Sequence, residues 1–199
     1  MKYESLHFSK LIKDVSGGNV KLKRNEYEED GILPIIDQGK ELIGGYTNNK
    51  QAKFKGKLPV IIFGDHTRVF KYIDFDFIMG ADGVKVLKVS EKLHPKYCYY
   101  YLNSCYIPAT GYNRHFKYLK EVQIPLPPLS DQKRIAEILD KADAIRQKNK
   151  ELLVAYDELL KATFLDMFGD PVINPKEWDK INLDVKYSPS LDNYFSKIS

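Results

Sequence analysis

Apolar residues recur every seven positions between residues 131 and 168, and no glycine or proline interrupts this segment. A seven-residue apolar repeat is typical of a helix that pairs with another helix. The pattern therefore predicts one continuous helix of about 38 residues, about 57 Å long at ~1.5 Å per residue. Ser130 is expected at its N-cap, and Gly169 just after its last residue, with Pro171 beyond.

Two positions of the repeat form the predicted contact stripe of this helix. Asn149 stands near its middle, where a buried amide fixes the register and the choice of partner at some cost in stability. A helix of this length is longer than the preceding domain can cover, so we prefer an intermolecular coiled coil to packing on its own domain. The predicted interface residues are Ile135, Ile138, Ala142, Ile145, Asn149, Leu152, Tyr156 and Leu159.

Residues 1–128 have a different pattern, in which short apolar segments of strand length alternate with turn residues. Segment 60–63 is apolar at every position, which predicts a central strand. Pro95 favours a helix over residues 96–104, and a further short helix is expected over residues 9–15. The strands are predicted at residues 20–22, 31–36, 58–63, 68–77 and 84–89. The fold class is therefore α+β, with a mixed, mostly antiparallel sheet domain with short helices followed by one long coiled-coil-forming α-helix.

The charge of the chain is unevenly divided between these two parts. Residues 1–128 contain 20 Lys and Arg against 14 Asp and Glu, whereas residues 129–199 contain 11 against 13. A basic surplus on the globular part is typical of a nucleic-acid-binding domain. The surplus is modest, so it supports this interpretation without deciding it.

The composition also bears on location. No apolar run approaches the ~18 residues that a membrane span requires, and the first residues do not form a secretory signal. Cys98 and Cys105 lie seven positions apart and form no CxxC motif, and no histidine lies nearby at the spacing of a metal site. They are expected to be buried thiols on one helix face in a reducing compartment. We therefore predict a cytoplasmic protein with no membrane partner.

Candidate loop 1 (residues 64–68) directly follows the predicted central strand. Its residues His66, Thr67 and Arg68 are expected to project from a turn held by the sheet. Imidazole and guanidinium groups can donate hydrogen bonds to base acceptors or phosphates. The alternative is a structural turn in which Arg68 pairs with Asp74 or Asp76.

Candidate loop 2 (residues 110–117) places an aromatic ring, an amide and three basic side chains within six residues. Base edges and phosphates need this combination of groups. The alternative is a surface loop whose aromatic residues simply fill the core. The predicted DNA-binding residues of this loop are Tyr112, Asn113, Arg114, His115 and Lys117. Polar segments 38–40 and 46–50 are weaker candidates.

The segment LPPLSDQKRIAEILDKADAI (residues 126–145) closely resembles the conserved region of the specificity (S) subunit of type I restriction–modification systems. The resemblance continues through LLVAYDELLKATFLDMFGDPVINPKEW (residues 152–178). In that family, such a helix follows a target-recognition domain and pairs antiparallel with a second helix of the same kind. The resemblance also favours DNA binding by candidate loop 1, because similar loops recur in this branch of the family.

The resemblance implies three parts: residues 1–128 as the target-recognition domain, 129–169 as the conserved helix, and 170–199 as a tail that begins an incomplete second recognition domain. The helix is expected to serve as spacer, dimer interface and docking surface for methyltransferase subunits. A family member usually has two recognition domains and two conserved helices. Only one of each is expected here, so we expect a half-subunit that forms a homodimer. Its target would be a split palindrome, with half-sites at most about 17 base pairs apart for ~57 Å at ~3.4 Å per step.

The implied function is that of a non-catalytic, sequence-specific DNA-recognition subunit that binds one half of a bipartite double-stranded target. Its expected partners are methyltransferase subunits, which carry S-adenosylmethionine, and restriction motor subunits, which use ATP and Mg²⁺. We expect no cofactor or metal on this chain itself. No phosphate-binding GxxxxGK[ST] motif or methyltransferase motif is present.

Two alternatives remain open. The chain could be a truncated or reservoir half-subunit that acts as a coiled-coil interaction protein without reading DNA. It could also be a stand-alone nuclease that uses Asp74, Asp76, Asp82 and Lys85, although the first two look like the exposed face of a strand.

Overall fold

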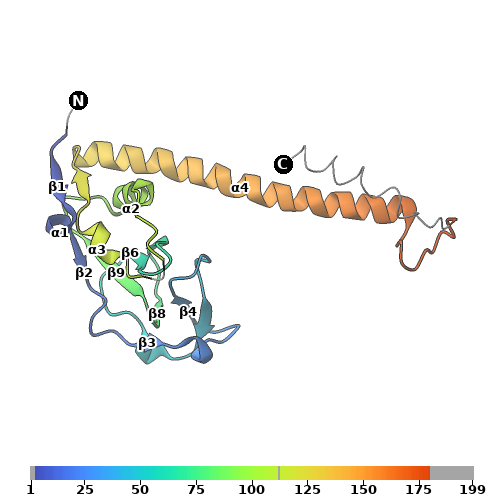
Figure 1. The fold of residues 1–199 in the computed structure, drawn as a ribbon, viewed down its shortest axis with the longest axis horizontal. Coiled ribbons are helices and arrows are strands. Elements are labelled where there is room, and N and C mark those ends of the chain that lie inside the picture. The colour runs from blue at the N-terminus through green and yellow to red at the C-terminus, as the bar shows by residue number, and fades with distance from the viewer. Residues whose placement is uncertain (1–2, 112, 180–199) are drawn as a thin grey trace. The chain divides into compact units, whose positions relative to one another are not determined.

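The computed structural model describes residues 3–111 and 113–179, and it divides into two compact units, Met1–Asp143 and Ala144–Ser199 (Figure 1). The elements in chain order are β1 (Ser5–His7), α1 (Phe8–Leu11), β2 (Ile12–Asp14), β3 (Lys21–Leu22), η1 (Arg24–Glu26), β4 (Leu33–Ile36), β5 (Gly45–Thr47), η2 (Lys50–Ala52), β6 (Val60–Gly64), β7 (Phe70–Ile73), β8 (Ile78–Gly80), β9 (Val84–Val89), α2 (Pro95–Ser104), α3 (Phe116–Leu119), β10 (Gln123–Pro125) and α4 (Leu129–Phe168).

The central sheet of the first unit has the order β2-β9-β6-β7 and is antiparallel throughout. Successive side chains of a strand point to opposite faces. On β6, Ile61 and Phe63 therefore join one buried cluster, while Val60 and Ile62 join another. Both faces of this strand are covered, which explains the apolar run without polar alternation. The prediction of a central strand at residues 60–63 is confirmed.

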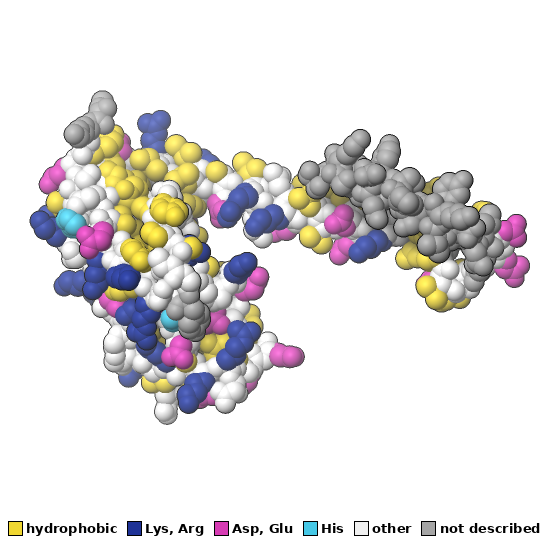
Figure 2. Space-filling model, viewed as in Figure 1, with side chains coloured by type: hydrophobic (Ala, Val, Ile, Leu, Met, Phe, Trp, Pro, Cys, Tyr) yellow, Lys and Arg dark blue, Asp and Glu magenta, His cyan; other side chains and the backbone are white. Residues whose placement is uncertain are grey.

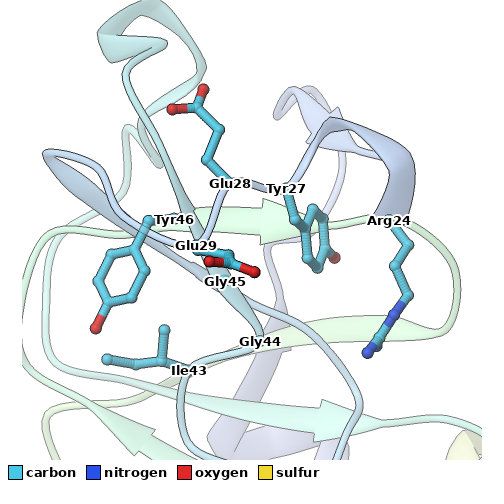
Figure 3. A pocket seen from close by; sticks show the side chains of 8 residues that line it. All are labelled: Arg24, Tyr27, Glu28, Glu29, Ile43, Gly44, Gly45 and Tyr46. Atoms are coloured by element: carbon cyan, nitrogen blue, oxygen red, sulfur yellow. The ribbon is translucent and has the colours of Figure 1, made fainter.

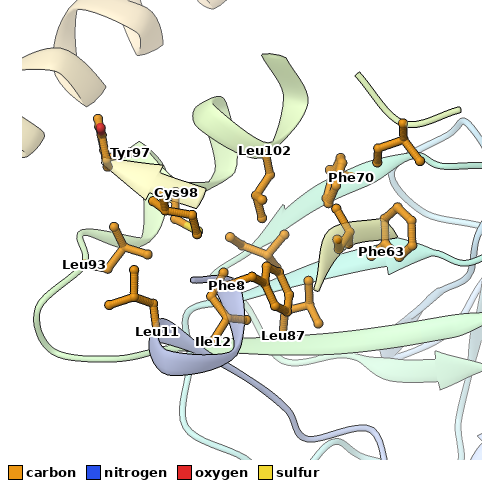
Figure 4. Packing of buried hydrophobic residues seen from close by; sticks show 14 of the residues in the cluster. Phe8, Leu11, Ile12, Phe63, Phe70, Leu87, Leu93, Tyr97, Cys98 and Leu102 are labelled. Atoms are coloured by element: carbon orange, nitrogen blue, oxygen red, sulfur yellow. The ribbon is translucent and has the colours of Figure 1, made fainter. Parts of the chain in front are cut away.

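The first cluster lies between the central sheet and the short helices. Phe8 of α1, Cys98 and Leu102 of α2 and Leu119 of α3 pack against Phe63 and its neighbours (Figure 4). Burial raises the pKa of the Cys98 thiol, as expected for an inert core cysteine. Cys105 follows the last residue of α2 and is only half-buried, so the prediction of two buried thiols holds for one of them.

The second cluster joins the central sheet to a mixed sheet of order β3-β8-β4-β5. In this sheet β8 runs parallel to both β3 and β4, whereas β4 and β5 are antiparallel. A third sheet pairs β1 with β10, which fixes the start of the chain beside the segment that leads into α4. The α+β class with a mixed, mostly antiparallel sheet is confirmed.

Several predicted boundaries were wrong. The helix expected over residues 9–15 ends at Leu11, because Ile12–Asp14 instead pairs with β9. The strand expected over residues 68–77 is limited to Phe70–Ile73, and Arg68 has a left-handed φ of 63°. Strands β1, β2, β5, β8 and β10 were not predicted; each has three residues and depends on a distant partner.

The first turns of α4 are fixed to the first unit by Gln132, which is 1% exposed. Its side-chain oxygen accepts from the backbone N–H of His94 at 2.8 Å, and its amide nitrogen donates to the carbonyls of Pro127 and Lys92 at 2.9 and 3.2 Å. The helix begins at Leu129, and the N–H groups of residues 131 and 132 donate to the Pro128 carbonyl. Ser130 therefore lies inside the helix and is not its N-cap.

The predicted end of the helix is confirmed: α4 ends at Phe168, and Gly169 follows with a φ of +78°. A Cβ on Gly169 would lie 2.9 Å from Pro175 Cγ, so the turn requires glycine. The indole N–H of Trp178 donates to the Phe168 carbonyl at 2.8 Å, and the Lys176 ammonium donates to the Met167 carbonyl at 2.9 Å. These two bonds satisfy carbonyls at the end of the helix that have no partner within it.

Asp140 also ties α4 to the first unit. Its carboxylate accepts from the Lys96 ammonium at 2.6 Å and from the Tyr100 hydroxyl at 2.7 Å. Burial acts to raise the pKa of Asp140, but the hydrogen bonds from Lys96 and Tyr100 outweigh it and leave the pKa below its usual value. The folded state therefore favours the charged carboxylate. The resulting stabilisation of the folded state is fully present above the unfolded pKa of about 3.9.

We expect Asp140→Asn to lower the free energy of unfolding at pH 7 by under about 1 kcal/mol, because this ion pair is one-third exposed and screened by solvent. The difference from wild type should shrink as the pH falls below about 4, since the wild-type carboxylate is then protonated through its folded pKa. Urea unfolding from pH 7 to pH 3 measures it. A difference that stays constant over this range would contradict the assignment.

Candidate nucleic-acid interface

The two candidate loops, about 50 residues apart in the chain, meet at Asp65. Its side-chain Oδ1 accepts from the backbone N–H of Phe116 at 2.7 Å, and its carbonyl accepts from the backbone N–H of His115 at 2.9 Å. Asp65 is 2% exposed, so these bonds are shielded from water. A charged acceptor at a buried site strengthens such bonds. Candidate loops 1 and 2 are therefore held together as one surface.

His115 was expected to contact DNA, and the structure corrects this prediction. Its side chain is 1% exposed. Its Nδ1 lies 2.9 Å from the Asp65 carbonyl oxygen, which can only accept, so Nδ1 carries the proton. The backbone N–H of Thr110 lies 3.5 Å from Nε2 on the other side of the ring. His115 therefore holds candidate loop 2 in place and does not reach a bound molecule.

Candidate loop 1 is a tight turn that only glycine can begin. A Cβ on Gly64 would lie 2.2 Å from the Thr67 hydroxyl oxygen. The N–H of Arg68 donates to the Gly64 carbonyl at 2.7 Å, and the Gly64 N–H donates to the Val69 carbonyl at 2.9 Å. Thr67 and Arg68 are exposed, while His66 is half-buried. Two of the three predicted side chains are thus presented to solvent.

The alternative ion pair for Arg68 is not formed. Its Nη1 donates to the Ile107 carbonyl at 3.1 Å, just before candidate loop 2, and Asp76 instead accepts from Lys53 at 2.7 Å. Arg68 thus adds a second tie between the two candidate loops. A guanidinium has five N–H donors, so a single bond to Ile107 leaves most of them for other acceptors.

A third segment, the turn at residues 37–40, completes this surface. The Thr67 hydroxyl donates to the Gln38 carbonyl at 2.6 Å, and the His66 N–H donates to the Gln38 side-chain oxygen at 3.2 Å. A Cβ on Gly83 would clash with both Gln38 and His66, and the φ of Gly83 is +71°. The sequence marked segment 38–40 only as a weaker candidate, and no local pattern indicated that it lies beside candidate loop 1.

Beneath this turn lies Lys71, which is 3% exposed. Its ammonium donates to the Asp37 carbonyl at 2.8 Å and lies 3.6 Å from the Asp37 carboxylate. Burial lowers the pKa of Lys71, and the attraction of Asp37 opposes that shift. Arg24 lies 3.6 Å from the other Asp37 oxygen but is largely exposed. This buried ion pair fixes the base of the 37–40 turn, and no sequence pattern indicated it.

Candidate loop 2 presents three of its predicted residues to solvent: Asn113, Arg114 and Lys117 are all exposed. The Asn113 side-chain amide donates to the Thr110 carbonyl, and the Lys117 ammonium lies 5.1 Å from the centroid of the Tyr118 ring. Tyr112 lies outside the described residues. In Figure 2, dark blue Lys and Arg side chains outnumber acidic ones over the part of the first unit that carries α3 and its neighbouring loops.

An open depression of about 420 Å³ lies elsewhere, between η1 and β5 (Figure 3). Glu28 and Glu29 line it, and Glu28 also accepts from the Asn48 side chain at 2.9 Å. Carboxylates at this site repel phosphates. Arg24 lines the same depression, so segment 46–50 stays a weaker candidate for DNA contact.

Two of the four residues of the nuclease alternative form ion pairs with residues outside that set. The Lys85 ammonium pairs with Asp14 at 2.8 Å, and Asp76 pairs with Lys53 at 2.7 Å. Within residues 3–111 and 113–179, no group of three or more His, Cys, Asp or Glu side chains is placed to hold a metal ion. No helix in that described part is long and apolar enough to cross a membrane.

The predicted contact stripe of α4 is exposed along its length. Ile138, Ile145, Leu152 and Leu159 have exposed fractions of 56, 61, 49 and 61%. The remaining predicted interface residues, Ile135, Ala142, Asn149 and Tyr156, are exposed as well. Large exposed apolar patches of this kind mark interaction surfaces.

Comparisons with a family model, with a related protein and with solved structures agree. The family model of the type I restriction modification DNA specificity domain matches residues 10–154. The chain is 31% identical over 137 residues to the specificity subunit of the type I restriction enzyme EcoR124I/EcoR124II from Escherichia coli. That match covers 62% of this chain and 34% of the relative, so the chain spans about a third of that protein.

Two solved structures share the fold at 19% identity. One comes from a study of complex assembly and conformational transition in the type I R-M system, with a TM-score of 0.59 over 81% of this chain and 43% of the other. The second is the S subunit of a type I restriction-modification system from M. genitalium, with a TM-score of 0.57 over 84% of this chain and 46% of the other.

Proposed function

The chain belongs to the family of type I restriction–modification DNA specificity domains, and from this premise we propose that residues 1–128 recognise one half of a bipartite double-stranded DNA target. The observation that carries the proposal is the joining of candidate loops 1 and 2 through buried Asp65. Four exposed polar side chains surround this joint: Thr67, Arg68, Asn113 and Arg114.

These side chains have the chemistry that base recognition requires. Arginine binds guanine through two hydrogen bonds, and asparagine binds adenine in the same way. The Thr67 hydroxyl donates its proton to the Gln38 carbonyl, so it would accept from a base amino group, while Lys117 suits a phosphate. The buried bonds of Asp65 and His115 keep the loops in one arrangement, which lowers the entropy lost on binding.

The long helix α4 would act as spacer and as dimer interface. Its exposed apolar stripe needs a partner, and a second copy in antiparallel orientation would bury both stripes at once. The two-fold axis of such a homodimer would make the DNA target a split palindrome. Asn149 would set the register of the pair.

The chain would have no catalytic activity of its own. Methyltransferase subunits carrying S-adenosylmethionine would assemble on α4 and the recognition domain, and motor subunits using ATP and Mg²⁺ would join them. The family membership supports this set of partners. The alternative function is that of a coiled-coil interaction protein that docks on methyltransferase subunits without reading DNA.

Arg114→Ala should weaken binding to the selected DNA by about 10- to 100-fold, which corresponds to the loss of one bidentate base contact of ~1–3 kcal/mol. The duplexes would be those that the wild-type chain, assembled with methyltransferase subunits, enriches from a random pool. Arg114→Lys should recover phosphate attraction but not base preference, because an ammonium cannot form the paired contact. Fluorescence anisotropy with the enriched and scrambled duplexes measures both effects.

Arg134→Ala, on the first turns of α4, is the matched control, because it removes the same charge outside the candidate loops. It should leave the base preference unchanged. If Arg114→Ala and Arg68→Ala both retain wild-type affinity and preference at low salt, the candidate loops are not the recognition surface. If the wild-type assembly enriches no sequence, the interaction-protein alternative replaces the proposal.

A further inference from the structure

One aromatic ring beside the candidate loops is contacted by two lysines that the proposed recognition does not use. The Lys85 ammonium lies 5.0 Å from the centroid of the Phe116 ring, and the Lys120 ammonium lies 5.7 Å from it. These distances are within the range of cation–π attraction. Lys85 comes from β9 and Lys120 follows α3, so two separate elements bring positive charge to one point.

Phe116 is itself held firmly. Its ring packs edge-on against Phe8 at 6.0 Å between centroids and lies 6.3 Å from Phe63. Its backbone N–H donates to Asp65, the residue that joins the two candidate loops. The ring therefore has a fixed position relative to the candidate loops, and both ammonium groups lie within 6 Å of its centroid.

The two ammonium groups keep donors for a further partner. Lys85 forms an ion pair with Asp14 at 2.8 Å, and its side chain is 29% exposed. Asp14 also accepts from the N–H of Ser16 at 2.9 Å, so its charge is shared. An ammonium has three donors, and Lys120 is exposed.

We propose that Lys85 and Lys120, held against the Phe116 ring, bind the phosphate backbone of the DNA whose bases the candidate loops contact. This inference rests on the proposed function. Contacts to phosphates position a protein on the duplex but carry no sequence information. Lysines that are already ordered against an aromatic ring lose less conformational entropy on binding than free surface lysines. Lys117, on the same short helix, would extend this phosphate-binding patch.

The test is the salt dependence of binding to a 30-base-pair duplex of random sequence. Each phosphate contact adds about 0.9 to the slope of log affinity against log salt concentration. The double variant Lys85→Gln/Lys120→Gln should therefore reduce the steepness by about 1.8 and weaken binding about 30-fold at 0.15 M salt. Lys85→Arg/Lys120→Arg keeps the charge and should retain the wild-type slope.

Lys53→Gln is the matched control. Lys53 is also an ion-paired lysine, at 2.7 Å from Asp76, but it lies beside β8 of the mixed sheet. Its slope should equal that of wild type. An unchanged slope in the double glutamine variant, with wild-type thermal stability, would overturn the proposal. A loss of affinity confined to the enriched duplexes would also overturn it, because that pattern indicates base contacts.

The two proposals fail in distinguishable ways. If the wild-type assembly enriches no sequence while the double glutamine variant still flattens the slope, base recognition fails and the phosphate-binding patch stands. If a sequence is enriched and the slope does not change, the recognition surface stands and the patch is wrong.

Discussion

Replacing both Ile145 and Leu152 by glutamate is expected to convert the proposed homodimer into a monomer. In the proposed pair these side chains, now 61 and 49% exposed, would be buried against the second copy. Each buried aliphatic side chain contributes about 1.5–3 kcal/mol, and the variant would also bury unpaired carboxylates. The dimer dissociation constant should rise at least about 1,000-fold, equivalent to ~4 kcal/mol. Sedimentation equilibrium at micromolar concentration measures this change.

A control places glutamates on the other side of the helix. Gln147→Glu and Lys150→Glu lie at positions of the seven-residue repeat that face away from the stripe. Both should remain dimeric. A wild-type chain that is monomeric at micromolar concentration, or a double glutamate variant that stays dimeric, would contradict the homodimer.

Lys71→Ala should produce the second large effect, a loss of about 3–5 kcal/mol in the free energy of unfolding. Removing one partner of a buried ion pair leaves the other charge uncompensated. Here the remaining partner would be Asp37, whose only other ion pair is with the exposed Arg24 at 3.6 Å within the described residues. Because the Lys71 ammonium also holds the Asp37 carbonyl, the 37–40 turn beside candidate loop 1 should loosen.

Urea unfolding compares Lys71→Ala with Lys53→Ala, which breaks an ion pair of 2.7 Å that is about half exposed. The Lys53 variant should lose under about 1 kcal/mol, because exposed pairs are screened by water. Lys71→Met keeps an unbranched apolar side chain but lacks the charge. Its loss in the free energy of unfolding should be as large as that of Lys71→Ala. Equal small losses for all three variants would show that the Lys71–Asp37 pair does not fix the turn.

The long helix and the central strand could be predicted because their signals are local. The seven-residue repeat and Gly169 locate α4 to within two residues, and the apolar run at residues 60–63 marks a strand covered on both faces. The predicted start of α4 was two residues too late, since the Pro128 carbonyl accepts the first bonds and Ser130 is therefore not the N-cap.

The candidate site could be predicted only in part, because its arrangement depends on contacts between distant segments. The composition of loops 64–68 and 110–117 drew attention to both, but nothing in it indicated that Asp65 would join them. The same contact explains the error at His115, whose polar ring looked available and is instead buried against the Asp65 backbone. The contribution of Gln38 was equally invisible, since its partners lie almost 30 residues away.

The short strands were missed for a related reason. Ile12–Asp14 has too few residues to show an alternating pattern, and its strand conformation comes from pairing with β9. Likewise β8 lies between β3 and β4 as a parallel neighbour of both, an arrangement set by the whole fold. Local propensity is a weak guide where such long-range pairing decides the structure.

The most direct test of the proposed function is to co-express the chain with candidate type I methyltransferase subunits in a methylation-deficient bacterium and to map methylated adenines across the genome. The proposed homodimer predicts methylation at a single split palindrome. This methylation should be lost with Ile145→Glu/Leu152→Glu and altered in base preference with Arg114→Ala. Methylation at an asymmetric target, or the absence of any methylated motif, would contradict it.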